Sequence, residues 1–231
     1  HNGAGDENEW DMIMKKIVRE SMNKKDKYSN RMSLPKDGVI LAENDDIQLR
    51  AVSEDQKDYM LRVSYECSFF KHEFENDTYR KYLWEEFISE NAANYCIYIN
   101  DTKDFIGYCG IKDLTRKIPE LAIELLPKYR NHGYGFQALA LLMDQFSVIT
   151  GENIFRTRVE VDNYVSQSLH RKLGAVPNGL SEFLLHGEDL IRYQNENQYL
   201  IDDNIRKLAV DFGVDPIEIL GHVLEYKIEW K

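Results

Sequence analysis

The sequence predicts a mixed α/β fold, formed by one main domain that carries an extension. Three observations support this prediction. Segments with the period-two alternation of strands are interleaved along the chain with segments of helical spacing. The 231 residues, 43% of them hydrophobic, are enough to bury a core. No internal repeat or low-complexity run interrupts this pattern.

The N-terminal segment, residues 1–44, is predicted to be an extension with one amphipathic helix. Apolar residues recur there at helical spacing, namely Trp10, Ile13, Met14, Ile17, Val18 and Met22. A polar, lysine-rich stretch then ends the pattern near Asn30. We expect this extension to pack on the main domain or, alternatively, to contact a partner. The first five residues, "HNGAG", are left out of the fold prediction.

The main domain, residues 45–231, begins with a strand, "DIQLRAVS", whose apolar residues alternate. Ser53 and Gln56 then form the pattern of a capping box, which predicts a helix start. A second helix is expected after Asp77. The run "YCIYINDTKDFIGYCGI" predicts a β-hairpin, and "ELAIELLP" predicts a further strand.

The second half of the chain continues the interleaved pattern. "FQALALLMDQF" is an amphipathic helix, "IFRTRVEV" a strand, and "NYVSQSLHRKLGA" a helix that stops at Gly174. "LSEFLLH" and "VLEYKIEW" are predicted strands. Between them we expect a helical insertion at about residues 195–221, in which Gly213 ends one helix and Asp215-Pro216 begins another.

The composition restricts the partners and the compartment. With a net charge of -11 and a pI near 5.1, neither nucleic acid nor an anionic membrane surface is expected as a main partner. The acidic balance is compatible with a cationic substrate, and is equally typical of soluble acidic proteins in general. No stretch reaches the ~18 apolar residues of a membrane helix, and no export leader is expected.

Three cysteines, Cys67, Cys96 and Cys109, are odd in number and form no Cys-x-x-Cys pair. This pattern favours a reducing, cytoplasmic location over a disulfide framework or a zinc site, and no metal is expected. Cys96 and Cys109 lie in predicted strands, so we expect them to be small core residues.

A basic, glycine-bearing loop, "PKYRNHGYG", joins a predicted strand to a predicted helix. Arg130, Gly133 and Gly135 form the pattern Arg-x-x-Gly-x-Gly, which alone indicates an ordinary turn or an anion site equally well. In the second case, the unpaired N–H groups and partial positive charge at the helix start would hold the anion. The pattern is neither a Walker loop nor a dinucleotide fingerprint, since no Gly-Lys-Ser/Thr follows and the first glycine is missing.

A second motif follows this loop, with 33 residues from Arg130 to Asn163. "NYVSQSLHRKLGA" contains Asn-x-x-Ser-x-x-Leu-x-x-Lys-Leu-Gly. The two motifs, in this order of strands and helices, resemble the GNAT superfamily of acetyl-CoA-dependent N-acetyltransferases. The branch of ribosomal-protein N-terminal acetyltransferases (RimJ/RimL-like) is the most similar. The resemblance covers residues 45–175 and implies a mostly antiparallel sheet, splayed at the coenzyme A site and flanked by helices.

The resemblance also implies the residues that bind coenzyme A. The pyrophosphate would be held by the backbone amides of one loop, which comprises Arg130, Asn131, His132, Gly133, Tyr134 and Gly135. Leu125 and Leu126 would pair with the pantetheine arm as an added strand does. Asn163 would contact this arm or fix the following helix, and an ordinary N-cap is the alternative role.

Acetyl transfer from a thioester to an amine requires a base, an oxyanion donor and a proton for the leaving thiolate. Glu120 and Glu124 lie four apart on one predicted strand and therefore share a face. Alignment by eye with the family favours Glu120, whereas Glu124 lies nearer the expected thioester. Glu160, on the neighbouring strand, occupies a position that serves as base in some relatives. At least two of these three are expected to be solvent-facing strand residues.

The acid is less clearly indicated. Many members of the family have a tyrosine where this chain has His170, so a tyrosine acid is in doubt here. Ser166, in the Asn-x-x-Ser position, and His170 are the candidates. A serine that only caps the helix and an inert surface histidine are the alternatives.

The predicted function is therefore N-acetyl transfer from acetyl-CoA to a primary amine, directly and in a ternary complex. The acceptor would be a small amine or a protein N-terminus, and the oligomeric state, monomer or homodimer, is open. The stretch "FFKHEFENDTYRKYLWEEF" shapes the acceptor pocket in such relatives, and its acidic residues suit a cationic acceptor. The alternative is a catalytically weak GNAT-like module that binds an acyl-CoA as a sensor or interaction domain.

Overall fold

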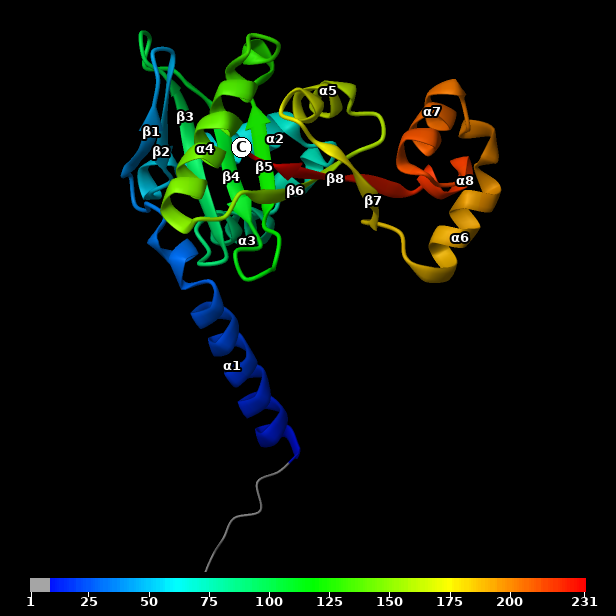
Figure 1. Cartoon of the computed structure of the whole chain (residues 1–231), viewed down its shortest axis with the longest axis horizontal. Coiled ribbons are helices and arrows are strands. Elements are labelled where there is room, and N and C mark those ends of the chain that lie inside the picture. Colours follow the sequence, from blue (N-terminus) through cyan, green and yellow to red (C-terminus); the bar gives the residue numbers. More distant parts are fainter. Residues whose placement is uncertain (1–8) are drawn as a thin grey trace, which may run out of the picture.

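An open sheet runs through the protein in the strand order β1-β2-β3-β4-β5-β6-β8-β7 (Figure 1). The computed structural model describes residues 9–231. Neighbouring strands are antiparallel throughout, except for β5 and β6, which are parallel. The strands are β1 (Ile40–Glu43), β2 (Ile47–Ala51), β3 (Ala92–Ile99), β4 (Phe105–Lys112), β5 (Glu120–Leu125), β6 (Ile154–Val159), β7 (Val176–Glu182) and β8 (His222–Glu229). This topology confirms the predicted mixed α/β class with a mostly antiparallel sheet.

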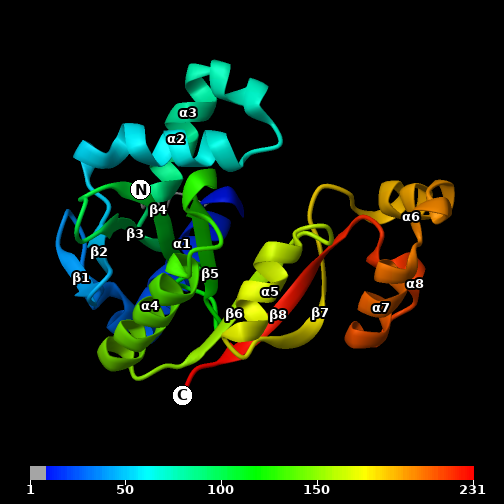
Figure 2. The same cartoon turned by 90° about the horizontal axis from the view of Figure 1, so that it is seen from above.

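Helices cover both faces of this sheet. In Figure 2, α2 and α3 lie on one face, and α4 and α5 lie on the other. The helices are α1 (Glu9–Lys27), α2 (Lys57–Cys67), α3 (Asp77–Phe87), α4 (Tyr134–Thr150), α5 (Tyr164–Lys172), α6 (Gly187–Glu196), α7 (Asp203–Phe212) and α8 (Pro216–Ile219). Two apolar clusters result, a larger one centred on α4 and a smaller one beneath α2 and α3.

Several local predictions are confirmed. Ile47, Leu49 and Ala51 of β2 are all buried, as their alternation indicates. The capping box between Ser53 and Gln56 is present. Gly213 ends α7 in a left-handed conformation with φ of 66°, which a residue without Cβ adopts at low cost.

The parallel strands β5 and β6 separate almost at once. Only Glu120 and Arg156 are paired in register, although each strand is six residues long. Beyond this pair the two strands diverge, so the later backbone groups on that edge of β5 have no neighbouring strand. The sheet is therefore splayed at the carboxyl ends of β5 and β6.

The helical insertion lies between β7 and β8. Helices α6, α7 and α8 gather at the far end of these two strands (Figure 1). Because Glu182 pairs with His222, and Leu224 pairs with Val159, the insertion leaves the sheet at the end where β6 diverges from β5. It begins at Gly187, earlier than the predicted start near 195, and the last predicted strand before it, "LSEFLLH", is shifted toward Val176.

The N-terminal extension was delimited incorrectly. Strand β1 falls within residues 1–44 and pairs with β2, so it is part of the sheet. Helix α1 has no buried residue and points away from the body (Figure 1), so it does not pack on the main domain in the expected way. The first eight residues, including "HNGAG", lie outside the described residues.

Two further expectations concern burial and membranes. Cys96 and Cys109 are fully buried, which confirms them as core residues, and all three cysteines are free thiols. Across residues 9–231, no helix combines the length and apolar character needed to cross a membrane.

Candidate active site

The open edge of β5 forms one wall of the candidate site. The Leu126 N–H donates to Ile106 O on the β4 side (2.9 Å), whereas Pro119 O accepts from Arg156 N–H on the β6 side (2.9 Å). Because backbone groups alternate along a strand, those of Ile123 and Leu125 point toward the gap left by β6. Leu126 O accepts from Tyr129 N–H (2.9 Å), so both backbone groups of Leu126 are used within the protein. Of the two leucines expected to pair with pantetheine, the geometry favours Leu125.

The glycine-bearing loop follows directly and leads into α4. Asn131 and Gly133 both have positive φ, at 62° and 85°, and Gly133 is the N-cap of α4. Among the described residues, none accepts a hydrogen bond from the amides of Asn131, His132 or Gly133. The amides of the first helical turn also lack intrahelical partners. This string of N–H groups at a helix start fits an anionic group.

The two loop glycines serve different purposes. A Cβ on Gly133 would meet no atom within 4 Å, so its positive φ is what favours glycine there. A Cβ on Gly135 would lie 3.2 Å from Leu169 Cδ2 and 3.5 Å from side-chain atoms of Ile123 and Leu125. Gly135 therefore allows α4 to pack closely against β5 and α5, which the sequence pattern did not reveal.

The side chain of Arg130 turns back toward β5. Its Nε donates to Leu125 O (3.0 Å) and its Nη2 lies 3.2 Å from Cys67 Sγ. The guanidinium thus fixes the end of β5. Burial, together with the nearby carboxylate of Glu124, raises the pKa of the Cys67 thiol to about 11, which leaves it protonated at neutral pH.

Helix α5 begins on the other side of the gap. Asn163 caps it, because its Oδ1 accepts from Ser166 N–H (3.1 Å). This is the alternative role considered for Asn163, and it leaves the side-chain Nδ2 for other contacts. Ser166 is half-buried, and its Oγ lies 3.3 Å from His170 Nδ1.

His170 is a buried side chain, 2% exposed, and not a surface histidine as supposed. Its Nδ1 donates to Ser166 O (2.8 Å) and its Nε2 accepts from Thr157 Oγ1 (3.1 Å). Burial lowers the pKa of His170 and so favours the neutral ring. Both nitrogens are engaged between α5 and β6, which gives His170 a packing role and makes it a poor acid.

The three candidate bases have different surroundings. Glu120, 8% exposed, accepts from Arg158 Nε (3.0 and 3.1 Å) and from Arg156 Nη2 (3.0 Å). Two guanidinium groups compensate this carboxylate, so it is a structural ion-pair partner. Glu160 is exposed just beyond β6. It follows the last residue of β6, Val159, beyond the single pair, Glu120 and Arg156, that joins β5 to β6.

Glu124 lies in a pocket beneath α2 and α3. Its Oε1 accepts from the Tyr108 hydroxyl (2.9 Å), and Oε2 is buried with no donor among the described residues. Burial raises the pKa of Glu124, against the opposing effect of the hydrogen bond from Tyr108. A carboxylate with a raised pKa is a stronger proton acceptor.

A cavity of about 170 Å³ adjoins this carboxylate. Asn94 lines it and donates through Nδ2 to Phe87 O (2.8 Å), while its Oδ1 is buried without a donor. Glu124 and Asn94 thus line the cavity, and each has one buried oxygen, Oε2 and Oδ1, that accepts no hydrogen bond of normal geometry from a described residue. The Ser64 hydroxyl and the Cys67 thiol lie near the Glu124 carboxylate. A buried polar group of this kind is costly unless a ligand or water pairs with it.

Sequence patterns did not identify Tyr108 and Asn94. Register pairs Asn94 with Gly110, and Tyr108 with Glu124, so both lie beside Glu124 on one face. Polar residues within the apolar runs of the predicted hairpin were the available signal. No three His, Cys, Asp or Glu side chains within residues 9–231 are grouped as metal ligands would be.

Comparison with known proteins identifies the family. A model described as an acetyltransferase (GNAT) domain matches residues 45–176, more than half of the chain. No curated protein sequence matches the chain.

Solved structures show the same fold. RimL, a ribosomal L7/L12 alpha-N-protein acetyltransferase in complex with coenzyme A, is similar over 83% of this chain and 98% of its own. The identity is 13% and the TM-score 0.57. A chimera of the spermidine N-acetyltransferase SpeG from Vibrio cholerae and hSSAT is similar over 79% of this chain and 95% of its own, at 14% identity and a TM-score of 0.55. These likenesses show a shared fold, and the family model shows that the chain belongs to the GNAT family of acetyltransferases.

Proposed function

We propose that the protein transfers the acetyl group of acetyl-CoA to a primary amine, by direct attack in a ternary complex. The observation that carries this proposal is a pair of buried acceptors without a donor among the described residues, Glu124 Oε2 and Asn94 Oδ1, on two residues that line the cavity beneath α3. An ammonium group has three donors and a positive charge, so it suits acceptors of this kind.

The donor side of the site rests on backbone groups. The free amides from Asn131 to Gly135 would hold the pyrophosphate, and the Leu125 N–H at the open edge of β5 would pair with the pantetheine arm. Acetyl-CoA supplies the acyl group already activated as a thioester. Arg130 supports this wall by holding the Leu125 carbonyl, while the exposed ring of His132 lies outside these contacts.

Glu124 is proposed as the base. Its carboxylate would take a proton from the bound ammonium, so that the neutral amine can form the new C–N bond as the C–S bond breaks. The Tyr108 hydroxyl donates to one carboxylate oxygen and leaves the other available as the proton acceptor. The leaving thiolate then takes a proton from Ser166 or from water, since both ring nitrogens of His170 are engaged.

The acceptor is proposed to enter through its amine end alone. A cavity of about 170 Å³ is small compared with common ligand pockets of about 300–1,000 Å³, so the remainder of the acceptor would lie outside it. Charged residues of both signs, Glu86, Lys112 and Asp113, also line this cavity. A protein N-terminus, as in the name of RimL, and a polyamine, as in that of SpeG, both meet this requirement. The three free cysteines suit a reducing compartment such as the cytoplasm.

A binding module with little turnover is the second candidate function. The burial of His170, in the position where many relatives have a tyrosine acid, is the observation that favours it. Thiol release from acetyl-CoA, measured against polyamines, aminoglycosides and peptides with different N-termini, separates the two functions. Release that depends on the amine, and that Glu124→Gln removes, supports the enzyme. Binding of acetyl-CoA without release for any amine supports the module.

A further inference from the structure

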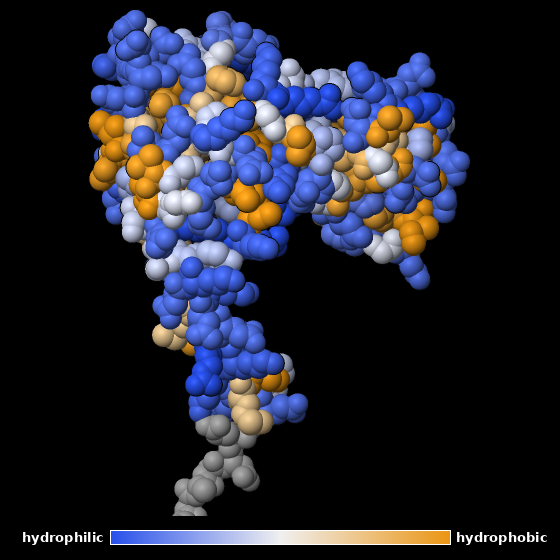
Figure 3. Space-filling view, in the orientation of Figure 1, coloured by the Kyte–Doolittle hydropathy of each residue, from blue (hydrophilic) through white to orange (hydrophobic). Residues whose placement is uncertain are grey.

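Helix α1 carries an apolar stripe whose side chains are all exposed within residues 9–231. The helix is 19 residues long and has no buried residue. Trp10 is 74% exposed and Met22 is 62% exposed. At 100° per residue, most of its exposed apolar side chains fall on one face, namely Trp10, Ile13, Met14, Ile17, Val18 and Met22. Figure 3 shows hydrophobic surface on this helix, separate from the body. A stripe of this kind on a soluble surface indicates a binding face.

The base of α1 is anchored to the body. Arg31, just after the helix, is fully buried, and its guanidinium donates to Leu114 O (2.8 Å) and to both oxygens of Glu152 (2.7 Å each). The same guanidinium lies 4.0 Å from the centre of the Tyr28 ring, and Lys25 pairs with Glu90 (2.5 Å). These contacts direct α1 outward, as Figure 1 shows, and therefore present the stripe to another molecule.

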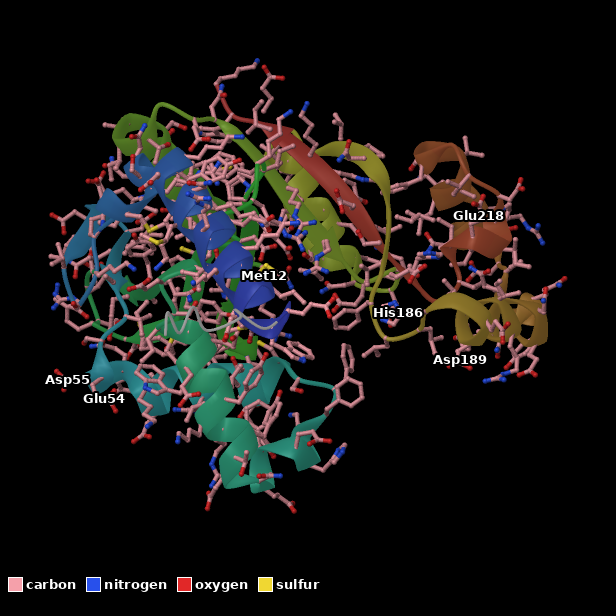
Figure 4. The ribbon with its side chains drawn as sticks, turned by 90° about the horizontal axis from the view of Figure 1, so that it is seen from below. Met12, Glu54, Asp55, His186, Asp189 and Glu218 are labelled. Atoms are coloured by element: carbon pink, nitrogen blue, oxygen red, sulfur yellow. The ribbon has the colours of Figure 1, made fainter. Side chains whose placement is uncertain are left out.

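The helical insertion does not supply the missing cover within the same chain. Figure 4 shows Met12 on α1, and Asp189 and Glu218 on the insertion, at separate places in the molecule. In Figure 1, α1 extends away from both the sheet and the insertion.

Charge along α1 differs from charge in the rest of the chain. The helix has six basic and four acidic residues, a net charge of +2, whereas the whole chain has -11. The acidic residues Glu9 and Asp11 lie in the first turn, and the basic residues Lys24, Lys25 and Lys27 lie in the last turn. The two ends of the helix therefore have opposite charge.

We propose that two copies of this chain pair through α1 in an antiparallel arrangement. A two-fold axis brings the same apolar stripe of each copy together. An antiparallel pair places the acidic start of one helix beside the basic end of the other, whereas a parallel pair would place like charges together. With the axis passing near Val18, Met14 of one copy faces the partner's Met22. An anionic membrane is a poorer occupant, because the acidic first turn and the net charge of -11 oppose it.

This interface does not depend on the proposed function, since α1 precedes the matched acetyltransferase domain. One helix from each copy buries less than the about 1,200–2,000 Å² of a standard interface, so a dissociation constant in the micromolar range is expected. The dimer should therefore depend on concentration.

Sedimentation of the full chain over about 1 to 100 μM tests the pairing. The mass of one copy is 27.2 kDa, and we expect twice this mass at the upper end of the range. Ile17→Glu, on the stripe, should weaken the dimer at least tenfold. Asn23→Glu, with the same charge change on the opposite face, should leave it unchanged. Both positions are exposed, and circular dichroism checks that the two variants fold.

Cysteine cross-linking tests the orientation. A mixture of the variants Met14→Cys and Met22→Cys should form a mixed disulfide, whereas Met22→Cys alone should not cross-link beyond the wild-type level. Met22→Cys that cross-links with itself would contradict the antiparallel pair. A wild-type chain that stays monomeric at every concentration, or that sediments with phosphatidylserine vesicles as a monomer, overturns the proposal. A dimer that Ile17→Glu leaves intact overturns it as well.

Discussion

Replacing Glu124 and Glu120 separately by glutamine should divide catalysis from stability. The Glu124 carboxylate accepts from the Tyr108 hydroxyl through one oxygen, and its second oxygen is buried without a hydrogen bond of normal geometry from a described residue. General-base catalysis contributes about 10²–10⁴-fold, and the lower part of this range applies because water can partly replace the base. We expect Glu124→Gln to lower kcat by about 10²–10³-fold, equivalent to about 2.7–4.1 kcal/mol of barrier. Its melting temperature should change little, because the substitution removes a carboxylate whose charged form is disfavoured by burial.

Glu120→Gln should have the opposite effect. Removing one partner of a buried ion pair costs about 3–5 kcal/mol. Here Arg156 keeps a second partner, Asp113 (2.7 Å), and the Arg158 side chain is 34% exposed, so the cost should be nearer 1–3 kcal/mol. For a chain of this size the melting temperature should drop by roughly 2–12 °C. The folded fraction should keep kcat within about twofold of the wild type, a change of about 0.4 kcal/mol in barrier, because Glu120 is held by Arg156 and Arg158 and takes no part in the proposed proton transfer.

Calorimetry and thiol release on the same preparations measure both quantities. The reasoning is refuted if Glu124→Gln retains about a third or more of the wild-type kcat, or if Glu120→Gln loses activity without losing stability. Glu160→Gln, at the exposed position across the gap, serves as the third variant and should change neither quantity appreciably.

Three further predictions follow from the same geometry. Gly133 and Gly151 lie at the two ends of α4, with φ of 85° and 76° and open space where a Cβ would stand. Gly133→Ala and Gly151→Ala should each lower the free energy of unfolding by about 1–2 kcal/mol in calorimetry. Only Gly133→Ala should also weaken coenzyme A binding in titration calorimetry. Because burial raises the pKa of Glu124, kcat should fall on acidification at a pH above the ordinary range of a glutamate. The stability of the wild type relative to Glu124→Gln should decline as the pH rises through the raised pKa, because the buried carboxyl then loses its proton. A flat pH–rate profile or a constant difference in stability would argue against Glu124 as the base. Arg31→Met should lower the free energy of unfolding, measured in urea, by about 3–5 kcal/mol, because Glu152 and three backbone carbonyls lose their hydrogen-bond donor. A change of less than about 1 kcal/mol would contradict the anchoring role described for Arg31 at the base of α1.

The order of the elements and the coenzyme A loop could be predicted from sequence because they depend on local patterns. Alternation marks the long strands, and glycine marks positions of positive φ such as Gly133 and Gly213. Strand β1 was missed because four residues are too few to show a period, and its place depends on pairing with β2. The start of the insertion at Gly187 was missed for a similar reason, since only Leu190 of α6 is buried.

The roles of the charged residues could not be predicted, since periodicity identifies a face and not the partner on it. Glu120 and Glu124 share a face, as expected, yet two arginines of β6 meet only the first. His170 likewise follows the helical pattern of α5, and its burial depends on Thr157 of a different strand. Asn94 and Tyr108 reach Glu124 only through the register of β3, β4 and β5.

The central claim is that the cavity beneath α3, which Glu124 and Asn94 line, holds an amine for acetylation. Mass spectrometry of the amine, together with thiol release in the same reaction, tests it most directly. We predict one acetyl group on the amine nitrogen for each thiol released, with wild-type protein and with Glu120→Gln, and neither product with Glu124→Gln. Thiol release at the same rate with and without an amine, or an amine acetylated equally well by Glu124→Gln, would contradict the claim.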